Sequence, residues 1–334
     1  MRSMEDQSTT RGTACEPGLV SIIIPTYRRV PELKLAVESC LQQTHKSLEI
    51  IVVADGPDAE AWAAMEGLDP RVRYIELETN RGPAEARNTG VRASRGEWLT
   101  FLDDDDTILP RKIADTFALA DPAHPKQMIA CRTIYRRDGK DDVWPSQPIG
   151  KDEDVADYIL VRPSLMGRPG VIPVQSLMVH RSVLDEVPFT THKDHEDWAW
   201  LLEAWHLGGA RVIFCWEPLV IYNIVTQSIS RSRRLNWQDS LNWAMTYRKW
   251  MSPRALNSFL STKVAIKAKR AGDWGGLRKI AGIVLHNQPG LLDLAFLAGT
   301  ALLPIRLLHE LWLRSLHARG GTQNSSAEIA PPGS

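Results

Sequence analysis

The chain has 334 residues, of which 43% are apolar and 24% are charged, and this balance is typical of a globular protein with one large or two ordinary domains. Forty basic and forty acidic residues cancel, so the chain lacks the positive excess of nucleic-acid-binding proteins, and we expect no nucleic-acid partner. The four cysteines are widely spaced and form no CxxC pair, which favours neither a zinc site nor a disulfide framework.

The first hundred residues alternate between strand and helix patterns. Residues 1–17 are polar and predict a disordered tail. Short β-branched runs that end at turn residues predict buried strands, and apolar residues at helical spacing predict the segments between them. The predicted strands are 20–24, 48–54, 72–77 and 97–102, and the predicted helices are 31–43, 59–68 and 83–93. This alternation predicts a parallel sheet that is covered by helices on both faces.

The remainder of the chain is predicted to be more helical. A helix from 110 to 120, strands at 128–135 and 175–179, and a helix at 196–207 are expected, with 139–168 irregular apart from a short helix near 154–160. Further helices are expected at 237–250, 254–270, 277–286 and 291–316, and a disordered tail at 317–334. These patterns predict an α/β domain at 18–234 followed by a helical region at 235–316.

Three polar groups follow predicted strands of the sheet. They are Pro25-Thr26-Tyr27, Asp55 and the run Asp103 to Asp106. Ligands of parallel sheets bind beyond the carboxyl ends of the strands, so we expect these groups to meet at one edge. Four adjacent carboxylates repel one another and raise one another's pKa unless a cation lies among them. The run therefore favours a metal site over the alternative of an acidic surface turn.

Four sequence motifs then occur in order along residues 19–234. They are VSIIIPTY at 20–27, EIIVVADG at 49–56, NRGPAEARNTG at 80–90 and GEWLTFLDDDD at 96–106, followed by the weaker HEDW at 195–198 and QSISRS at 227–232. By these motifs the chain resembles the family 2 glycosyltransferases, an inverting family with the GT-A fold. The resemblance implies a Rossmann-like α/β fold, with a mixed sheet flanked by helices. The helical region at 235–316 would then be a C-terminal extension of that fold.

The resemblance also implies roles for the donor site. Pro25, Thr26 and Tyr27 would line the nucleotide pocket, and Asp55 would accept a hydrogen bond from the uracil N–H. Arg87 would hold the diphosphate or order the pocket. Two departures, Ala54 and Pro57, replace residues that are common in the family and weaken the prediction of a particular base.

The aspartate run corresponds to the DXD motif of that family. Asp105 would be a direct ligand of Mg²⁺ or Mn²⁺, and Asp103 would contact the ribose or the metal. Asp104 is counted with the nucleotide-sugar site, although Asp104 and Asp106 could instead face solvent or cap the following helix.

The pair Glu196-Asp197 corresponds to the ED motif of the family. Asp197 would be the general base that deprotonates the acceptor hydroxyl, with Glu196 as a supporting carboxylate. The alternative is the acidic first turn of an ordinary helix. The neighbouring His192 and His195 form an HxxH pair, which we interpret as polar surface and not as a transition-metal site.

Two basic regions leave alternatives open. Arg231, in a segment that often closes over the nucleotide in this fold, is a candidate ligand of the diphosphate, or else part of a solvated basic linker. The very apolar helix at 291–316, together with lysines and arginines at 248–279, could pack on the catalytic domain or lie at an anionic membrane surface. The corresponding location is the cytoplasm, or the inner face of the cell membrane.

The resemblance predicts an inverting, metal-dependent glycosyltransferase. It would move a sugar from a nucleotide donor, a UDP-sugar by preference, to a hydroxyl of a glycan or lipid-linked acceptor in cell-surface polysaccharide biosynthesis. Two alternatives are a catalytically silent nucleotide-sugar-binding scaffold and a phosphatase of the DxDxT type, with Asp103 as nucleophile.

Overall fold

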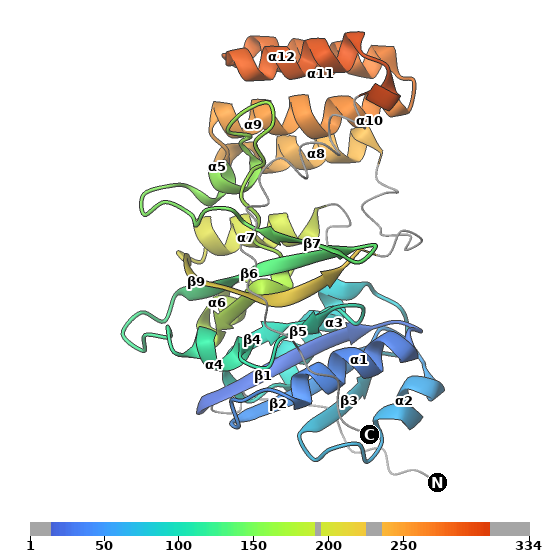
Figure 1. Cartoon of the computed structure of the whole chain (residues 1–334), viewed down its shortest axis with the longest axis vertical. Helices are drawn as coiled ribbons and strands as arrows, with labels where there is room; N and C mark the ends of the chain where they lie inside the picture. Colours follow the sequence, from blue (N-terminus) through green and yellow to red (C-terminus); the bar gives the residue numbers. More distant parts are fainter. Residues whose placement is uncertain (1–14, 191–194, 225–235, 308–334) are drawn as a thin grey trace.

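The computed structural model describes residues 15–190, 195–224 and 236–307. Its centre is one mixed sheet with strand order β3-β2-β1-β4-β8-β6-β9-β5, and β7 pairs with β6 (Figure 1). The strands are β1 Glu16–Thr26, β2 Leu48–Ala54, β3 Val72–Glu76, β4 Gly96–Phe101, β5 Thr107–Ile108, β6 Gln127–Arg137, β7 Lys140–Trp144, β8 Leu177–His180 and β9 Arg211–Asn223. The mixed sheet and its flanking helices confirm the predicted fold class.

The first four long strands form the parallel half of the sheet. β1 pairs in parallel with both β2 and β4, and β2 pairs in parallel with β3. Every residue of β2 is buried, as expected for a strand that is covered on both faces. The predicted bounds of β2 are correct, whereas β1 begins at Glu16, inside the segment predicted as a tail.

The second half of the sheet is antiparallel at β4–β8 and β8–β6 and parallel at β6–β9. β9 is long, yet its sequence did not predict a strand, because Trp216-Glu217-Pro218 interrupts the apolar pattern. The pairing register shifts where Arg132 of β6 meets Pro218, and proline is tolerated in a sheet at such irregular positions. β7 and the short helix α6, Arg181–Glu186, were also missed.

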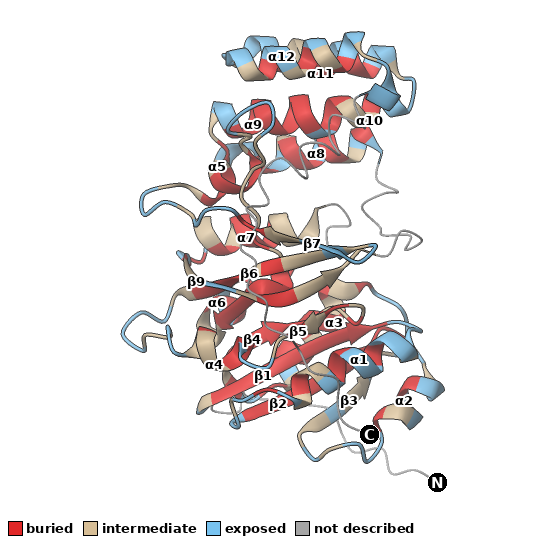
Figure 2. Cartoon of the chain, viewed as in Figure 1, coloured by how far each residue is buried: buried red, intermediate tan, exposed pale blue. Residues whose placement is uncertain are grey.

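Helices cover both faces of the sheet, and the strands between them are largely buried (Figure 2). One core cluster joins β1 and β2 to residues of α1, α2 and α4, and a second joins the opposite faces of β1 and β4 to α3, α6 and α7. A third, small cluster joins the opposite face of β2 to α3. These helices are α1 Val30–Leu41, α2 Ala59–Met65, α3 Pro83–Ala93, α4 Lys112–Phe117, α5 Val155–Leu160 and α7 Glu196–His206. α3 lies so close to β1 that a Cβ on Gly90 would stand 2.4 Å from Ile23 Cγ2.

The C-terminal helices stack at the end of the molecule opposite β2 and β3 (Figure 1). They are α8 Trp237–Tyr247, α9 Pro253–Phe259, α10 Ala265–Arg270, α11 Trp274–His286 and α12 Leu291–Leu302, with a π-helical turn at Leu260–Val264 between α9 and α10. Buried residues of α7 and of α8 to α12 belong to one core cluster that also contains residues of the sheet, so these helices pack against the α/β part of the chain.

The last predicted helix is interrupted. The helix predicted at 291–316 breaks after Leu302, because Pro304 follows and disfavours helical backbone at Leu303, which is extended, and helical backbone resumes at 305–307. The remainder of that prediction, 308–316, lies outside the described residues. Leu291 and Leu302 are 88% and 82% exposed, so both ends of α12 present leucine to the outside. Within the residues that the structure describes, no helix is both long and apolar enough to span a bilayer.

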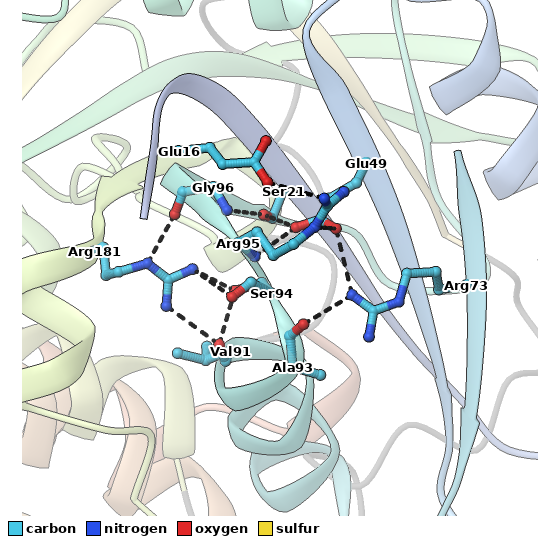
Figure 3. Close-up of polar contacts among 10 residues, drawn as sticks. All are labelled: Glu16, Ser21, Glu49, Arg73, Val91, Ala93, Ser94, Arg95, Gly96 and Arg181. Atoms are coloured by element: carbon cyan, nitrogen blue, oxygen red, sulfur yellow. Dashed lines mark hydrogen bonds and ion pairs between the residues drawn. The ribbon is translucent and has the colours of Figure 1, made fainter. Parts of the chain in front are cut away.

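A buried carboxylate ties together the amino-terminal ends of β1, β2 and β4 (Figure 3). Glu49 is 2% exposed and accepts hydrogen bonds from Ser21 Oγ at 2.7 Å and from the Arg95 N–H at 2.6 Å. Burial raises the pKa of Glu49, but these hydrogen bonds and the Arg95 guanidinium outweigh it, so the pKa is lowered overall. This network lies at the opposite ends of the strands from the aspartate run.

The network predicts that Glu49→Gln lowers the free energy of unfolding by about 1–3 kcal/mol at pH 7, since an amide NH₂ would face donors. Because folding lowers the pKa, the wild-type advantage is present above the ordinary glutamate pKa and is lost as the pH falls through the folded value. Urea denaturation at pH 7 and pH 3, with the exposed Glu38→Gln as control, measures it. A cost equal to that of the control at pH 7 would contradict the prediction.

Candidate active site

Arg87 is the centre of the polar site at the carboxyl ends of the parallel strands. Its Nη2 donates to Asp103 Oδ1 at 2.7 Å, and its Nη1 donates to Glu196 Oε1 at 3.1 Å and Asp197 Oδ1 at 3.5 Å. α3 carries Arg87, Asp103 follows β4, and the other two carboxylates begin α7. One guanidinium therefore joins the two acidic motifs, which lie more than ninety positions apart in the sequence.

The surroundings of Arg87 explain why it stays charged. Its side chain is only 3% exposed, and its guanidinium carbon lies 5.6 Å from the centroid of the Phe189 ring. Burial alone would lower the pKa, but Asp103, Asp197 and Glu196 raise it above the ordinary arginine value. Loss of either the cation or its carboxylate partners would therefore leave an uncompensated buried charge.

The middle of the aspartate run contacts the end of β1. Thr26 Oγ1 donates to Asp104 Oδ2 at 2.8 Å, and Arg29 Nη1 lies 3.3 Å from Asp104 Oδ1 and 2.8 Å from Asp105 Oδ2. Asp104 is 6% exposed, so the interpretation of this residue as solvent-facing is wrong. It instead fixes Thr26, and with it the segment that leads to Tyr27.

Asp106 neither faces solvent nor caps a helix. It is 1% exposed and accepts hydrogen bonds from Gln175 Nε2 at 2.8 Å and from the Asn223 N–H at 2.9 Å. The next helix, α4, has Arg111 as its N-cap, with no side-chain cap. Asp106 therefore anchors the aspartate run to β9 and to the segment before β8.

The aspartate run has an excess of negative charge, and the pKa values of three of its carboxyl groups are raised. Burial raises the pKa of Asp104 to about 6, against the opposing effects of Thr26 and Arg29. Burial and the neighbouring Asp103 raise the pKa of Asp105 and Asp106 as well. The site would accept more positive charge than Arg29 and Arg87 supply.

Asp197 lies in the first turn of α7, with 39% of its side chain exposed. Burial and the neighbouring Asp103 raise the pKa of Asp197, whereas Arg87 lowers it, and the net effect is an increase. A carboxylate that is accessible and has a raised pKa is suited to take a proton from a hydroxyl group.

His195 precedes this turn and packs among aromatic rings. It stacks on Trp198 with ring centroids 5.2 Å apart, lies 4.9 Å from the ring of Trp243, and its Nε2 is 3.1 Å from Ser240 Oγ. Burial and two nearby lysines lower its pKa to about 3. The interpretation of His195 as polar surface is therefore wrong, and its HxxH partner His192 lies outside the described residues.

The predicted nucleotide wall lies beside the run. The carboxylate of Asp55 accepts the N–H groups of Arg81 at 2.6 Å and Gly82 at 2.8 Å, so it shapes the turn into α3. Tyr27 is 43% exposed, with its ring over Gly56, and Pro25 is buried in β1. Arg231 lies outside the described residues. The other predicted residues occupy one continuous region.

The residues present fit a divalent cation that is shared with a substrate. In the described part of the chain, no group of three or more His, Cys, Asp or Glu side chains is arranged to hold a metal. Asp103 Oδ2 and Asp105 Oδ1 accept no hydrogen bond from another described residue. Mg²⁺ and Mn²⁺ are commonly held by one or two carboxylates together with substrate phosphates, which is what this pair could provide.

Sequence reasoning missed three residues that support the site: Arg29, Gln175 and Asn223. Arg29 lies two residues after Tyr27 of the Pro-Thr-Tyr motif, so the expected convergence of strand ends could have identified it. Gln175 and Asn223 hold Asp106 and the backbone of Asp105, yet they lie in segments whose sequence carries no motif.

Comparison with known proteins places the chain in a family. A model of the family described as glycosyl transferase family 2 matches residues 21–187, half of the chain. An uncharacterized glycosyltransferase of Haemophilus influenzae is 33% identical over 151 residues, 45% of this chain and 51% of the relative. The amylovoran biosynthesis glycosyltransferase AmsB of Erwinia amylovora is 24% identical over 263 residues, 75% of this chain and 85% of the relative. The chain thus spans about half the length of the first of these relatives.

A solved structure shows the same fold. The mannosyltransferase PcManGT from Pyrobaculum calidifontis, in complex with GDP-Man and Mn²⁺, superposes with a TM-score of 0.56 at 19% identity, over 90% of this chain and 86% of that one. The family match, the order of the motifs and this superposition agree. The chain belongs to the family 2 glycosyltransferases and has the GT-A fold.

Proposed function

We propose that this glycosyltransferase is inverting and metal-dependent, and that it transfers a sugar from a nucleotide donor, by preference a UDP-sugar, to a hydroxyl acceptor of a glycan or glycolipid in cell-surface polysaccharide biosynthesis. The observation that carries the proposal is the Arg87 bridge, which holds Asp103 on the donor side and Asp197 on the acceptor side of one site. AmsB, by its name an amylovoran biosynthesis glycosyltransferase, supports the setting.

The roles of the residues follow from their positions. Asp197 would take the proton of the acceptor hydroxyl as its oxygen attacks the anomeric carbon, with Glu196 and Arg87 fixing the carboxylate. A single displacement from the face opposite the leaving group would invert that carbon. Tyr27 and Asp55 would bound the nucleoside, and Asp103 and Asp105 would hold Mg²⁺ or Mn²⁺. When bound, such an ion would offset negative charge on the departing diphosphate.

Asp105→Ala tests the donor side. We expect the variant to lose the rise in melting temperature that UDP or GDP produces with Mn²⁺, because ligand binding to the folded state stabilises it and the variant lacks a metal ligand. A thermal-shift series over nucleotides, with and without Mn²⁺, measures this. Asp152→Ala, an exposed carboxylate on a loop, is the control. A Mn²⁺-dependent shift of wild-type size in Asp105→Ala would refute the role of Asp105.

The two alternatives fare differently. Membership of family 2 removes the case for a phosphatase of the DxDxT type, since that interpretation rested on the aspartate run alone. A silent nucleotide-sugar-binding scaffold is distinguished by turnover: it would bind the donor in the thermal-shift series and release no nucleoside diphosphate with any acceptor. The filled base position at Asp197 favours the enzyme.

A further inference from the structure

The outer face of α12 consists of aliphatic side chains. The exposed positions of this helix are Leu291, Leu294, Ala295, Ala298, Ala301 and Leu302. Spacings of three and four residues place them along one side of the helix. A surface helix normally has charged or polar residues on its outer side, so the polarity of this face is unusual.

The inner face of α12 contains the polar residues of the helix. Its buried residues are Asp293, Leu297 and Thr300. Asp293, the one charged residue of α12, is 7% exposed and accepts a hydrogen bond from the Gly290 N–H at 2.9 Å. The helix therefore directs an aspartate and a threonine toward the protein and three of its leucines outward, the reverse of an ordinary surface helix.

α12 lies at the end of the molecule that is farthest from β2 and β3 (Figure 1). It packs on α9, α10 and the π-helical turn, which leaves its other side uncovered by the described residues. Ile305 and Leu307, which follow the helix, are exposed as well. A continuous exposed apolar surface of this kind marks a site of contact with a partner protein or a membrane.

The C-terminal helices are basic, although the whole chain has no net charge. Residues 240–307 contain ten lysines and arginines but only two aspartates and no glutamate. One aspartate is Asp293, and the other, Asp273, accepts hydrogen bonds from Trp237 Nε1 at 3.0 Å and from the Gly276 N–H at 2.7 Å. The exposed cations of α10 and α11 and of the segment after α12 are Arg270, Arg278, Lys279 and Arg306.

A lysine and a tryptophan lie at the carboxyl end of α12. Lys269 Nζ donates to the carbonyl groups of Thr300 and Leu303, both at 2.5 Å. The same ammonium group lies 5.8 Å from the ring centroid of Trp274, which begins α11 and is 55% exposed. The apolar face therefore ends beside an exposed indole and a cation. Tryptophan is enriched where hydrocarbon meets the head groups of a bilayer, and long basic side chains extend toward the head groups there.

An anionic bilayer fits this surface better than a second copy of the chain does. A twofold dimer would place the same patch of both subunits in contact and would bring their cations together. Anionic phospholipids instead attract those cations, while their acyl chains cover the leucines. With 12 residues, or about 18 Å of helix, α12 is too short to cross the hydrocarbon core and is suited to lie along its surface.

We propose that the outer face of α12, together with Trp274 and the surrounding cations, binds the surface of an anionic phospholipid bilayer. The helix lies in the plane of the interface, with Leu291, Leu294 and Leu302 against the acyl chains. Bilayer binding requires neither a nucleotide nor sugar transfer, so it extends beyond the proposed function and the two can fail independently.

Flotation of the full chain with phosphatidylcholine vesicles that contain or lack phosphatidylglycerol tests the inference. We expect the wild type to bind the anionic vesicles about tenfold or more tightly than the neutral ones, because several cations meet anionic head groups. Leu291→Ser combined with Leu302→Ser should weaken binding to the anionic vesicles about tenfold or more, since two apolar contacts are lost. Leu35→Ser combined with Leu207→Ser removes two exposed leucines elsewhere and should bind as wild type.

A second pair of variants tests the cations. Arg270→Gln combined with Arg306→Gln should weaken binding to the anionic vesicles about fivefold or more, and added salt should weaken the binding of the wild type. Lys34→Gln combined with Lys151→Gln, which removes two exposed cations outside the C-terminal helices, is the matched control. Equal binding by the two double variants would contradict the role of the cations.

The inference is overturned if the wild type does not float, if it floats equally with neutral and anionic vesicles, or if the Leu291/Leu302 variant binds as its control does. Light scattering without vesicles tests the second copy, and a dimer that dissociates only in the Leu291/Leu302 variant would also overturn the inference. A melting temperature of that variant below that of its control would show that another part of the chain covers these leucines, with the same consequence.

Nucleotide binding separates this inference from the proposed function. UDP with Mn²⁺ should raise the melting temperature of the Leu291/Leu302 variant as it does that of the wild type, because the donor site lies in the α/β part of the chain. Absence of that rise in every protein would contradict the proposed function and leave bilayer binding unaffected.

Discussion

Asp197→Asn is expected to lower the rate of sugar transfer by about 10²–10⁴-fold, the range that a positioned general base contributes, while donor binding stays near that of wild type. Asparagine keeps the size of the side chain and an oxygen to accept from Arg87, but it cannot take the acceptor proton. Single-turnover transfer and calorimetric titration of the nucleotide measure the two effects separately.

The matched control for this variant is Asp239→Asn, which removes a carboxylate from the first turn of another helix, α8. It should transfer sugar at the wild-type rate. Transfer by Asp197→Asn at the rate of this control would show that Asp197 is not the base.

The same assignment fixes the direction of the pH dependence. Only the deprotonated form of Asp197 can act as base, and its pKa is raised by burial. The wild-type rate should therefore fall as the pH decreases through a value above the ordinary aspartate pKa. That limb should be absent from the residual activity of Asp197→Asn.

Arg87→Met is expected to lower the free energy of unfolding by about 3–5 kcal/mol, because it leaves Asp103, Glu196 and Asp197 without their shared buried cation. Transfer should be lost as well, since the carboxylates would separate or bind protons. Arg87→Lys should recover little, because one ammonium cannot reproduce a fork that contacts three carboxylates. Urea denaturation followed by circular dichroism measures the stability.

Arg92→Met is the control for that variant. Arg92 lies on the same helix, is 62% exposed and pairs with Glu85, so its loss should cost less than about 1 kcal/mol. Adding Glu196→Gln to Arg87→Met should restore part of the stability by removing one uncompensated charge. Equal stability of Arg87→Met and Arg92→Met would contradict the central role of Arg87.

The parallel half of the fold could be predicted from the sequence because its signals are local. β2 and α3 were predicted with correct bounds. The β-branched run and the turn that ends it define β2, and the proline at the first position defines the start of α3. β9 could not be predicted, because its pairing with β6 depends on a partner more than eighty positions away and its own pattern is broken at Pro218.

The site was predictable as a set of positions and not as a set of contacts. The strand ends indicated where Thr26, Asp55 and the aspartate run would lie. No local pattern indicates that Arg87 reaches Asp103 and Asp197 together, or that Asp106 turns inward to Gln175, because those contacts arise from packing between distant segments. The same limit explains why His195 was interpreted as surface although it lies among tryptophans.

The Arg87 bridge also sets a condition for exchanging parts between members of this family. The residues that the family model matches end at 187, so Asp103 lies inside the shared region while Asp197 lies beyond it. A chimera joined between them would have to preserve the fit of α3 against the start of α7, including the reciprocal hydrogen bonds of 2.9 Å between Asn88 and the backbone of Phe189. A chimera that lost this contact would contain both Asp103 and Asp197, but the two carboxylates would lie at the wrong distance from each other.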